Sequence, residues 1–277
     1  MGKNLKSYLM VAGDKEKHLS KIDALSCDVA MINLEDGVGD KKEALKLLQN
    51  RFEKDRFQSK NKCIVVRINP LDESGIDEIK VLNQLKPHAI RIPKIKTKED
   101  VQKALEFIDE DIEIHLSIET KEAFTNLAKL KLDRRVTTVY LGILDLLESL
   151  ELPQNLLQLE NPMIDYILSR FLVESKIAGF KPIFLTYQDY KNTEEFTLWL
   201  QKAKLMGYRA TSCISPTQVE IANEIFSNDE TETEKAKYIV KIFEENQANG
   251  ITGFSDETYG FIDEPIYKNA KQILKNI

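Results

Sequence analysis

Charged and polar side chains follow five successive apolar segments of the chain, each close to the point where its segment ends. They are Glu35 and Asp36, Arg67 and Asn69, Lys94, Glu119, and Asp145. If these segments are parallel strands of one barrel, their carboxyl ends share one face and the side chains meet there. One charged residue at such a place is often merely solvated, but agreement over five segments favours a functional cluster. The sequence therefore predicts four carboxylates and two cations around one site.

Four carboxylates gathered in one place repel one another, so a cation has to compensate their charge. That cation is either an arginine or lysine side chain or a bound metal ion. Because the cluster contains no histidine or cysteine, its metal ligands would be hard oxygens, which favours Mg²⁺ and disfavours zinc. Water and substrate oxygens would complete the octahedral coordination.

The two cations of the cluster suit different tasks. Arg67 has a planar fork that can hold a substrate carboxylate at two points. Lys94 could bind the same group as a point charge, or serve as a Schiff-base nucleophile if it were desolvated. The many acids nearby favour the metal route over the Schiff base.

Eight short β-rich segments, separated by longer amphipathic ones, must position these residues. The segments lie near residues 7–11, 28–34, 62–68, 88–94, 113–119, 136–142, 182–186 and 208–214. Several are apolar at nearly every position, as is typical of parallel strands covered on both faces. Eight β-α alternations without a long linker predict an α/β fold, one closed (β/α)₈ TIM barrel. A doubly wound open sheet is the alternative, but it would carry a glycine-rich phosphate loop where this chain has GDKEKH.

Capping signals mark several of the intervening helices. The pairs of a capping side chain and an acid three residues later are Asp40 with Glu43, Thr97 with Asp100, and Asn192 with Glu195. The helix that follows Asn192 has an apolar face and is expected to end at Gly207.

The chain changes character after residue 226. SNDETETEK is interpreted as a polar link, EKAKYIVKIFEEN as a helix and NGITGFSDETYG as a loop rich in glycine and polar residues, with FIDEPIYKNAKQIL as a closing segment. We therefore expect a barrel at residues 1–226 and a C-terminal helical extension with a lid at residues 227–277.

Composition and charge exclude several classes of protein. The 277 residues are 42% apolar and 30% charged, which is typical of a folded, water-soluble chain. The formal charge is −6 with both signs interspersed, which argues against a nucleic-acid partner. Apolar runs are far shorter than the ~20 residues of a membrane helix, and no signal-peptide core is present, so we expect no membrane partner and a cytoplasmic location. Cys27, Cys63 and Cys213 lie far apart and are predicted to be reduced core residues.

Several stretches of the chain resemble a known family. The run LMVAGDKEKHLSKIDALSCDVAMINLEDGVGDKKEAL is similar to the opening of the citrate lyase β-subunit-like family, acyl-CoA lyases and synthases that share a TIM barrel with the class II pyruvate aldolases. The resemblance continues in order through VVRINPLD, IRIPKIKTKEDV, LSIET, YLGILDL, YQDY, GYRATSCISPTQVEIANEIF and GFIDEP. Each motif is weak alone, but together they are specific and span nearly the whole chain.

This resemblance implies roles for the residues of the cluster. Glu119 and Asp145 take the positions of the Mg²⁺ ligands, and Arg67 takes that of the residue that binds the substrate carboxylate. Glu35 and Asp36 become a supporting acidic pair beside the metal and its waters. We group Lys94 with them as a candidate substrate-binding residue.

The resemblance also implies a lid. Asp263, in GFIDEP, falls where malyl-CoA lyases and malate synthase-like members have a catalytic acid/base on a mobile C-terminal lid. The same residue could be the N-cap of a helix that starts at Glu264-Pro265, and both roles can coexist. Because the family's lid reaches into a neighbouring subunit, commonly in a trimer, the resemblance implies a homotrimer.

Several positions depart from the family pattern at the substrate end. Lys6 replaces the arginine before the first strand, which keeps the charge but loses the fork, so Lys6 remains a candidate substrate-binding residue. Phe184 replaces an aspartate near the seventh strand. Ala210-Thr211 replaces a Gly-Lys pair before the eighth.

The other departures concern the end of the eighth strand and the sixth. Ser215 stands where the family has histidine, and with Pro216 and Gln218 it forms a capping box, so its predicted role is structural. Ile143 and Leu144 replace small polar residues and could shrink or dry the site beside the metal.

The residues and the resemblance together predict a Mg²⁺-dependent carbon-carbon lyase or synthase. Its substrate would be a small hydroxy-dicarboxyl-CoA, such as a malyl-, citramalyl- or citryl-thioester, and Asp263 would move one proton in reversible Claisen-type chemistry. A second possibility is a metal-dependent class II aldolase that acts on a hydroxy keto acid without a thioester. A third is a repurposed, non-catalytic barrel that binds a small acid. The third is motivated by the substitutions at Lys6, Phe184 and Ser215.

Overall fold

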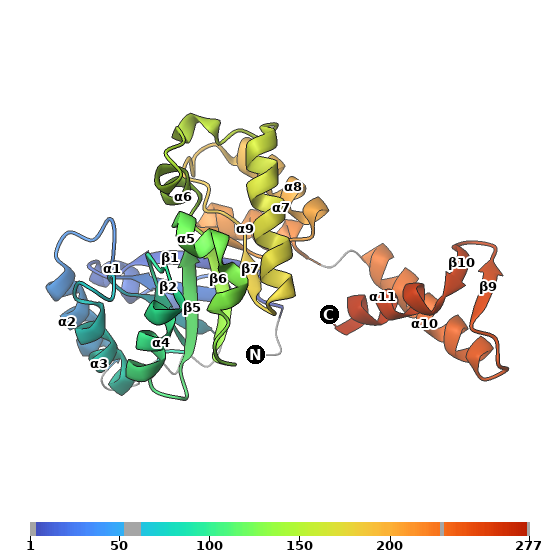
Figure 1. The fold of residues 1–277 in the computed structure, drawn as a ribbon, viewed down its shortest axis with the longest axis horizontal. Helices are drawn as coiled ribbons and strands as arrows, with labels where there is room; N and C mark the ends of the chain where they lie inside the picture. Colours follow the sequence, from blue (N-terminus) through green and yellow to red (C-terminus); the bar gives the residue numbers. More distant parts are fainter. Residues whose placement is uncertain (1–3, 53–61, 228–229, 276–277) are drawn as a thin grey trace. The chain divides into compact units, whose positions relative to one another are not determined.

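The structure is a computed structural model and describes residues 4–52, 62–227 and 230–275. The chain divides into two compact units, and the division falls between Phe226 and Ser227 (Figure 1). Asn228 and Asp229, within the segment interpreted as a polar link, lie outside the described residues.

Eight parallel strands form the sheet of the first unit, in the order β7-β6-β5-β4-β3-β2-β1-β8. They are β1 (Ser7–Ala12), β2 (Val29–Asn33), β3 (Cys63–Arg67), β4 (Ala89–Ile92), β5 (Glu113–Ile118), β6 (Val136–Leu141), β7 (Lys181–Ile183) and β8 (Thr211–Cys213). An isolated parallel bridge between Phe184 and Thr211 joins β7 to β8, so the sheet is nearly closed. The predicted (β/α)₈ barrel is confirmed.

Helices lie between the strands and around them (Figure 1). They are α1 (Glu16–Leu19), α2 (Lys41–Phe52), α3 (Gly75–Leu85), α4 (Lys98–Phe107), α5 (Lys121–Thr125), α6 (Ile143–Ser149), α7 (Pro162–Ile177), α8 (Thr193–Met206) and α9 (Pro216–Ile225). Three 3₁₀ turns, η1 (Ile22–Ala24), η2 (Leu127–Leu130) and η3 (Gln154–Leu156), complete the connections.

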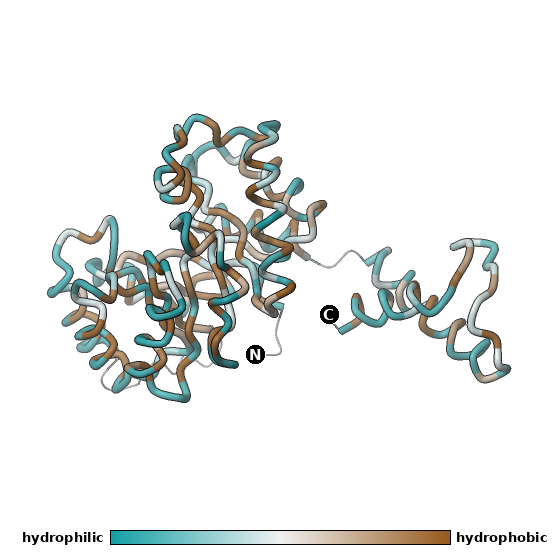
Figure 2. Tube along the Cα trace, viewed as in Figure 1, coloured by the Kyte–Doolittle hydropathy of each residue, from teal (hydrophilic) through white to brown (hydrophobic). Residues whose placement is uncertain are grey.

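Alternation along each strand separates two apolar layers. On β4, Ile90 and Ile92 belong to the large cluster beneath the helices, whereas Ala89 belongs to a smaller cluster with Tyr8 and Tyr140 inside the barrel. Figure 2 shows hydrophobic residues following the strands and the inner faces of the helices. Because both faces of the sheet are covered, the strands are apolar almost throughout, as expected of a parallel barrel.

The capping signals and the cysteine prediction are confirmed. Asp40 accepts from Glu43 N at 2.9 Å, Thr97 and Asp100 form a reciprocal capping box, and Asn192 accepts from Glu195 N at 3.1 Å. Gly207 ends α8 with a φ of 107°, a left-handed conformation that glycine adopts without strain. All three cysteines are buried and unbridged by disulfides in the described part of the chain.

The second unit comprises α10 (Glu230–Gln247), β9 (Gly253–Asp256), β10 (Gly260–Asp263) and α11 (Glu264–Lys275). The predicted helix is present but begins earlier, inside the supposed polar link. The segment predicted as a loop is instead an antiparallel hairpin of β9 and β10. Ile262 of the hairpin packs with Phe243 of α10 and Ala270 of α11, so a small core of its own selects the paired strands over a loop.

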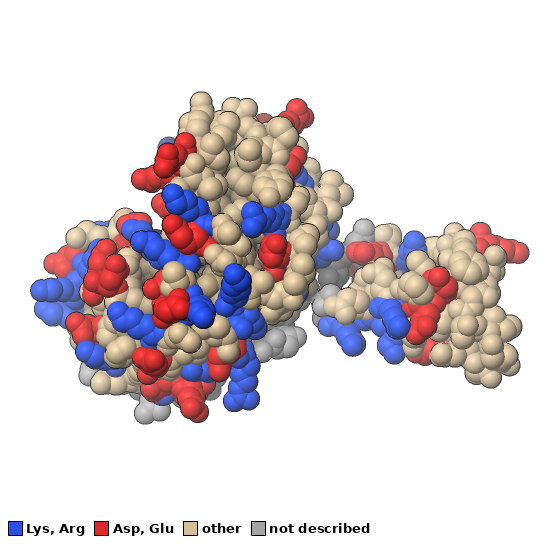
Figure 3. All heavy atoms as spheres, in the orientation of Figure 1, with Lys and Arg blue, Asp and Glu red and all other residues tan. Residues whose placement is uncertain are grey.

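The charged surface and the length of the helices agree with the sequence. On the face drawn in Figure 3, acidic and basic side chains lie intermixed over the first unit. Within the described ranges, every helix is too short or too polar to cross a lipid bilayer.

Candidate functional site

A cavity of about 480 Å³ opens at the carboxyl ends of the barrel strands. Its lining residues come from the ends of the strands and from the loops after them. They are Met10, Asn33, Asp36, Gly37, Arg67, Arg91, Glu119, Leu141, Gly142, Ile143, Leu144, Asp145, Gln154, Thr186, Gln188 and Ile214. Four members of the predicted cluster, Asp36, Arg67, Glu119 and Asp145, are among them. Parallel strands bring them together because all eight carboxyl ends meet on this face.

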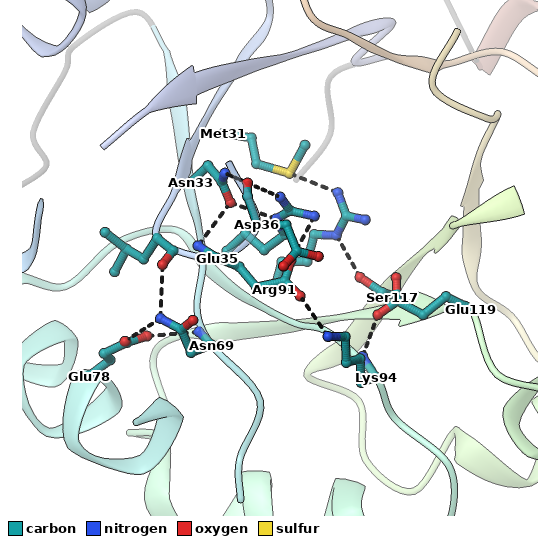
Figure 4. Close-up of polar contacts among 12 residues, drawn as sticks. Met31, Asn33, Glu35, Asp36, Asn69, Glu78, Arg91, Lys94, Ser117 and Glu119 are labelled. Carbon is teal, nitrogen blue, oxygen red and sulfur yellow. Dashed lines mark hydrogen bonds and ion pairs between the residues drawn. The ribbon is translucent and has the colours of Figure 1, made fainter. Parts of the chain in front are cut away.

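The end of β2 fixes the position of Arg67. Asn33 Oδ1 accepts from Arg67 Nε at 2.7 Å, and Glu35 Oε2 lies 2.9 Å from Arg67 Nη1. Asn33 Nδ2 also donates to the Asp36 carbonyl at 2.8 Å, which holds the loop that carries both acids (Figure 4). Burial raises the pKa of Glu35, although the Arg67 guanidinium acts in the opposite direction. Glu35 therefore orients Arg67 from beside the cavity.

Asn69 is buried and connects neighbouring elements of the barrel. It is completely buried, donates through Nδ2 to the Leu34 carbonyl and to Glu78 Oε1, and accepts nothing through Oδ1 among the described residues. These bonds tie the end of β3 to the end of β2 and to α3, and Asn69 does not line the cavity.

Glu119 is held at the end of β5 by its neighbours. Its Oε1 accepts from the backbone N–H of Lys94 at 2.5 Å, and Lys94 adopts a φ of 52°, a left-handed conformation that costs a lysine energy. A Cβ at Gly142 would lie 2.7 Å from Glu119 Cβ and 2.8 Å from Oε2. The close approach of the β6 end therefore requires glycine, and these two contacts fix where the carboxylate sits.

Lys94 itself is half exposed and lies beside the cluster. Its Nζ is 3.8 Å from Glu35 Oε1, and Lys94 is not part of the cavity lining. Although partial burial acts against it, the carboxylates of Asp36, Glu35 and Glu119 raise the pKa of Lys94. A lysine kept protonated is a poor nucleophile, so this environment disfavours the Schiff-base route.

Asp145 lies in the first turn of α6, which begins directly after Gly142, and it lines the same cavity as Glu119. Burial raises the pKa of Asp145, and the Asp36 carboxylate adds to the effect. Burial likewise raises the pKa of Glu119, against the opposing influence of Arg91. Burial therefore disfavours the charged form of each acid, and a bound cation would offset this cost.

The donor set fits Mg²⁺. Glu119 and Asp145 offer hard carboxylate oxygens to one cavity, and no group of three His, Cys, Asp or Glu in the described part of the chain could hold a metal by itself. Mg²⁺ usually takes one or two protein carboxylates and fills its remaining positions with water and substrate oxygens. Two carboxylates in an open cavity correspond to that arrangement.

Arg91 is a cavity residue that the sequence analysis missed. It lies inside β4, and burial together with the nearby Arg67 guanidinium lowers the pKa of Arg91 to about 10, which leaves it cationic at neutral pH. A charged residue inside an apolar strand, as in AIRIP, was the available signal. Thr186 and Gln188 after β7 were also missed, because no acid or base marks them.

Two predicted residues remain, Lys6 just before β1 and Asp263 in the second unit. Lys6 precedes β1, where its N–H donates to Asp28 Oδ2 at 2.7 Å, so it lies at the amino end of the strand, opposite the cavity. Lys6 is not among the residues that line the cavity. Asp263 belongs to the second unit, where its Oδ1 accepts from Ile266 N at 3.2 Å and caps α11. The N-cap part of the prediction is confirmed.

Comparison with known families decides the identity of this barrel. Residues 6–216 match the family described as HpcH/HpaI aldolase/citrate lyase. The chain belongs to that family.

The family and the lyases among its relatives make this chain an enzyme of the carbon-carbon lyase group. Individual relatives match most of its length. It is 28% identical over 248 residues to a (3S)-malyl-CoA thioesterase of Cereibacter sphaeroides, covering 88% of this chain and 85% of that protein. It is 25% identical to the mitochondrial citramalyl-CoA lyase of Rattus norvegicus, covering 97% and 85%. The structure of CitE from Mycobacterium tuberculosis with magnesium, acetoacetate and coenzyme A superposes with a TM-score of 0.78 at 17% identity, covering 100% and 99%.

The departures of this aldolase/citrate lyase chain have local explanations. Phe184 is buried against Trp199 and Tyr208 beneath the helices, with ring centroids 6.3 and 5.0 Å away, and takes no part in the cavity. Ser215 accepts from Gln218 N at 3.2 Å, so its structural role as a cap is confirmed.

The apolar pair after Gly142 does reach the site. Ile143 and Leu144 both line the cavity, together with Leu141 and Ile214, so part of its lining is hydrophobic. The cavity keeps about 480 Å³ in their presence, which is ample for a short keto acid.

Proposed function

We propose that the chain is a Mg²⁺-dependent carbon-carbon lyase or synthase that cleaves or forms a small hydroxy-dicarboxyl-CoA thioester. Malyl-, citramalyl- and citryl-thioesters are the candidate substrates. The observation that carries the proposal is that Glu119, Asp145 and Arg67 line one cavity at the carboxyl ends of the strands. The lyases among the relatives and the magnesium and coenzyme A in the CitE structure support this chemistry, whereas the malyl-CoA thioesterase supports only the class of substrate.

Glu119 and Asp145 would hold the metal. When bound there, Mg²⁺ supplies Lewis acidity that polarises a keto or hydroxyl oxygen and stabilises the charge that develops on it. The backbone N–H of Lys94 and the absence of a Cβ at Gly142 hold Glu119 in place. The apolar side chains of Ile143 and Leu144 would exclude water from part of the cavity, which would strengthen the interaction between the metal and its two carboxylates.

Arg67 would bind the carboxylate of the keto acid. A guanidinium has five N–H donors, and among the described residues three contacts are made, to Asn33, Glu35 and the Asp36 carbonyl. The remaining donors are free for substrate while these contacts hold the fork in one orientation. Such preorganisation lets binding energy serve the reaction rather than the ordering of the side chain.

Asp263 is our candidate for the general acid/base. In condensation it would remove a proton from the methyl group of the acyl thioester, and in cleavage it would return one. Its side chain is partly exposed, and Ile266 N contacts only Oδ1. Oδ2 is therefore available for proton transfer even while α11 remains capped.

The test is to incubate the full chain with Mg²⁺ and each of malyl-, citramalyl- and citryl-CoA, and to identify the products by chromatography. A lyase yields acetyl-CoA with glyoxylate, pyruvate or oxaloacetate, respectively. Glu119→Gln and Asp145→Asn should each abolish both turnover and Mg²⁺ binding measured by calorimetry. Release of free CoA with an intact hydroxy acid would instead indicate a thioesterase, and unchanged Mg²⁺ affinity in both variants would refute the site.

A further inference from the structure

Arg91 occupies an unusual place inside the barrel. On β4 it has the same orientation as Ala89, which packs inside the barrel with Val29, Met31 and Tyr140. Its neighbour across the strand pair is Arg67, so two arginines stand side by side at one level. The smaller apolar cluster, which includes Tyr8, Val65 and Ala210, also lies inside the barrel.

The contacts of Arg91 hold it in place without neutralising it. Nε donates to Ser117 Oγ at 2.9 Å, and Nη1 lies 3.3 Å from Met31 Sδ (Figure 4). The guanidinium carbon lies 4.1 Å from the centroid of the Tyr140 ring. A hydroxyl, a thioether and an aromatic face are all uncharged, and the thioether is a weak acceptor. Among the described residues, no carboxylate lies within ion-pair distance of Arg91 and nothing accepts from Nη2.

Burial makes this arrangement costly. Arg91 is 5% exposed, and the carboxylates of Glu119 and Glu35 act on it only from beyond ion-pair distance. A guanidinium withdrawn from water without a carboxylate in contact is disfavoured unless an anion completes it. Arg67, by comparison, is paired with Glu35 at 2.9 Å. Because Arg91 lines the cavity, the direction from which an anion can approach it is the cavity itself.

We propose that Arg91 binds a second carboxylate of the substrate, so that the site selects a keto acid with two carboxylates. The inference rests on the proposed function and deepens it, since one carboxylate and the keto oxygen are already assigned to Arg67 and the Glu119–Asp145 pair. Of the three candidate thioesters, the citryl-thioester alone yields a keto acid, oxaloacetate, with a further carboxylate. Arg91 is thus a specificity residue at the floor of the cavity.

The experiment compares two ligands that differ at one group. Oxaloacetate and 2-oxobutyrate share the keto acid end and chain length, but oxaloacetate has a carboxylate where 2-oxobutyrate has a methyl group. Their affinities are measured calorimetrically with Mg²⁺ on the full chain and on Arg91→Met, Arg91→Lys and Ser117→Ala, each checked by circular dichroism. A charged hydrogen bond corresponds to a preference for oxaloacetate of about 30-fold in the unsubstituted chain.

In Arg91→Met we expect this preference to fall below about 3-fold while the affinity for 2-oxobutyrate is retained, because only the second carboxylate loses its partner. Arg91→Lys should keep part of the preference. If Arg91→Met does not fold, Ser117→Ala tests the inference instead. It removes the hydrogen bond from Arg91 Nε and should reduce the preference for oxaloacetate about 3-fold.

An unchanged preference in the folded variants, or equal affinities in the unsubstituted chain, overturns the inference and leaves the proposed function intact. If neither keto acid binds the unsubstituted chain with Mg²⁺, the proposed function fails, and the inference fails with it.

Discussion

Arg67 Nη1 lies 2.9 Å from Glu35 Oε2, with 14% and 3% of the two side chains exposed. The nearest other cation to Glu35 among the described ion pairs is Lys94, whose Nζ is 3.8 Å from Oε1. The arginine assigned to substrate binding is therefore also the main counter-charge of a buried carboxylate. Stability and substrate binding depend on the same guanidinium.

This pairing predicts a coupled effect on stability. Arg67→Met leaves Glu35 buried with a distant partner, so the free energy of unfolding should fall by about 3 kcal/mol. Glu35→Gln removes the buried charge that Arg67→Met leaves unpaired. The loss of unfolding free energy in the double variant should therefore be smaller, by at least about 1 kcal/mol, than the sum of the losses in the two single variants. Urea unfolding of the three variants measures this coupling. Additive losses would mean that the two side chains do not share the contact.

Gly142 offers a second prediction, since a Cβ there would lie 2.8 Å from Glu119 Oε2. Gly142→Ala should displace the carboxylate by several tenths of an ångström or more and lower turnover about 100-fold, because small misplacements of reacting groups are costly. Mg²⁺ affinity should fall with it. Gly39→Ala is the matched control, since its Cβ would meet nothing closer than Asp14 Oδ2 at 3.9 Å. Equal activity of the two variants would argue against Glu119 as a ligand.

The barrel could be predicted from sequence because its signals are local. Apolar strands, caps such as Thr97 with Asp100, and the stop at Gly207 act over a few residues. Acids at strand ends were then brought together by topology alone, which is why Asp36, Glu119 and Asp145 reach one cavity. Their chemical roles remain predictions.

Arg91 and the hairpin could not be predicted in the same way. Whether Arg91 points inward depends on the register of β4 against β3 and β5, which the isolated segment does not reveal. The pairing of β9 with β10 depends on Ile262 meeting Phe243, nineteen positions earlier in the chain. The resemblance aligned Lys6 with a functional arginine, whereas the direction of β1 places Lys6 at the amino end of the strand, and its role remains a prediction.

Glu113 predicts how stability depends on pH. Its Oε2 lies 3.6 Å from His115 Nε2 and accepts a hydrogen bond from Thr137 Oγ1 at 2.7 Å. These two contacts, that of His115 above all, lower the pKa of Glu113 from 4.5 to about 2, although burial acts in the opposite direction. Because the folded pKa is the lower one, this stabilisation is complete above about pH 4.5 and is lost as the pH falls towards 2.

The corresponding measurement is urea unfolding of the unsubstituted chain and Glu113→Gln. After allowance for solvent screening, the difference in unfolding free energy should be about 2 kcal/mol at pH 6 and less than half of that at pH 3. Glu99→Gln, at an exposed glutamate 3.8 Å from Lys98, should show no difference at either pH. A gap that stays constant with pH would exclude a lowered pKa at Glu113.

Asp263 permits a variant that separates its two roles. Asparagine caps helices as well as aspartate does, so Asp263→Asn should preserve the bond from Ile266 N and the thermal stability of the chain. It cannot act as a base, and turnover should fall by at least about 100-fold with Mg²⁺ binding unchanged. Asp263→Ala should lose the same activity and also about 1 kcal/mol of stability with its cap.

Asp256→Asn is the matched control, because this residue accepts from Thr258 N and Tyr259 N in the same hairpin and should keep full turnover. Normal turnover in Asp263→Asn would leave Asp263 with capping alone, and the proton would have to be moved by another group.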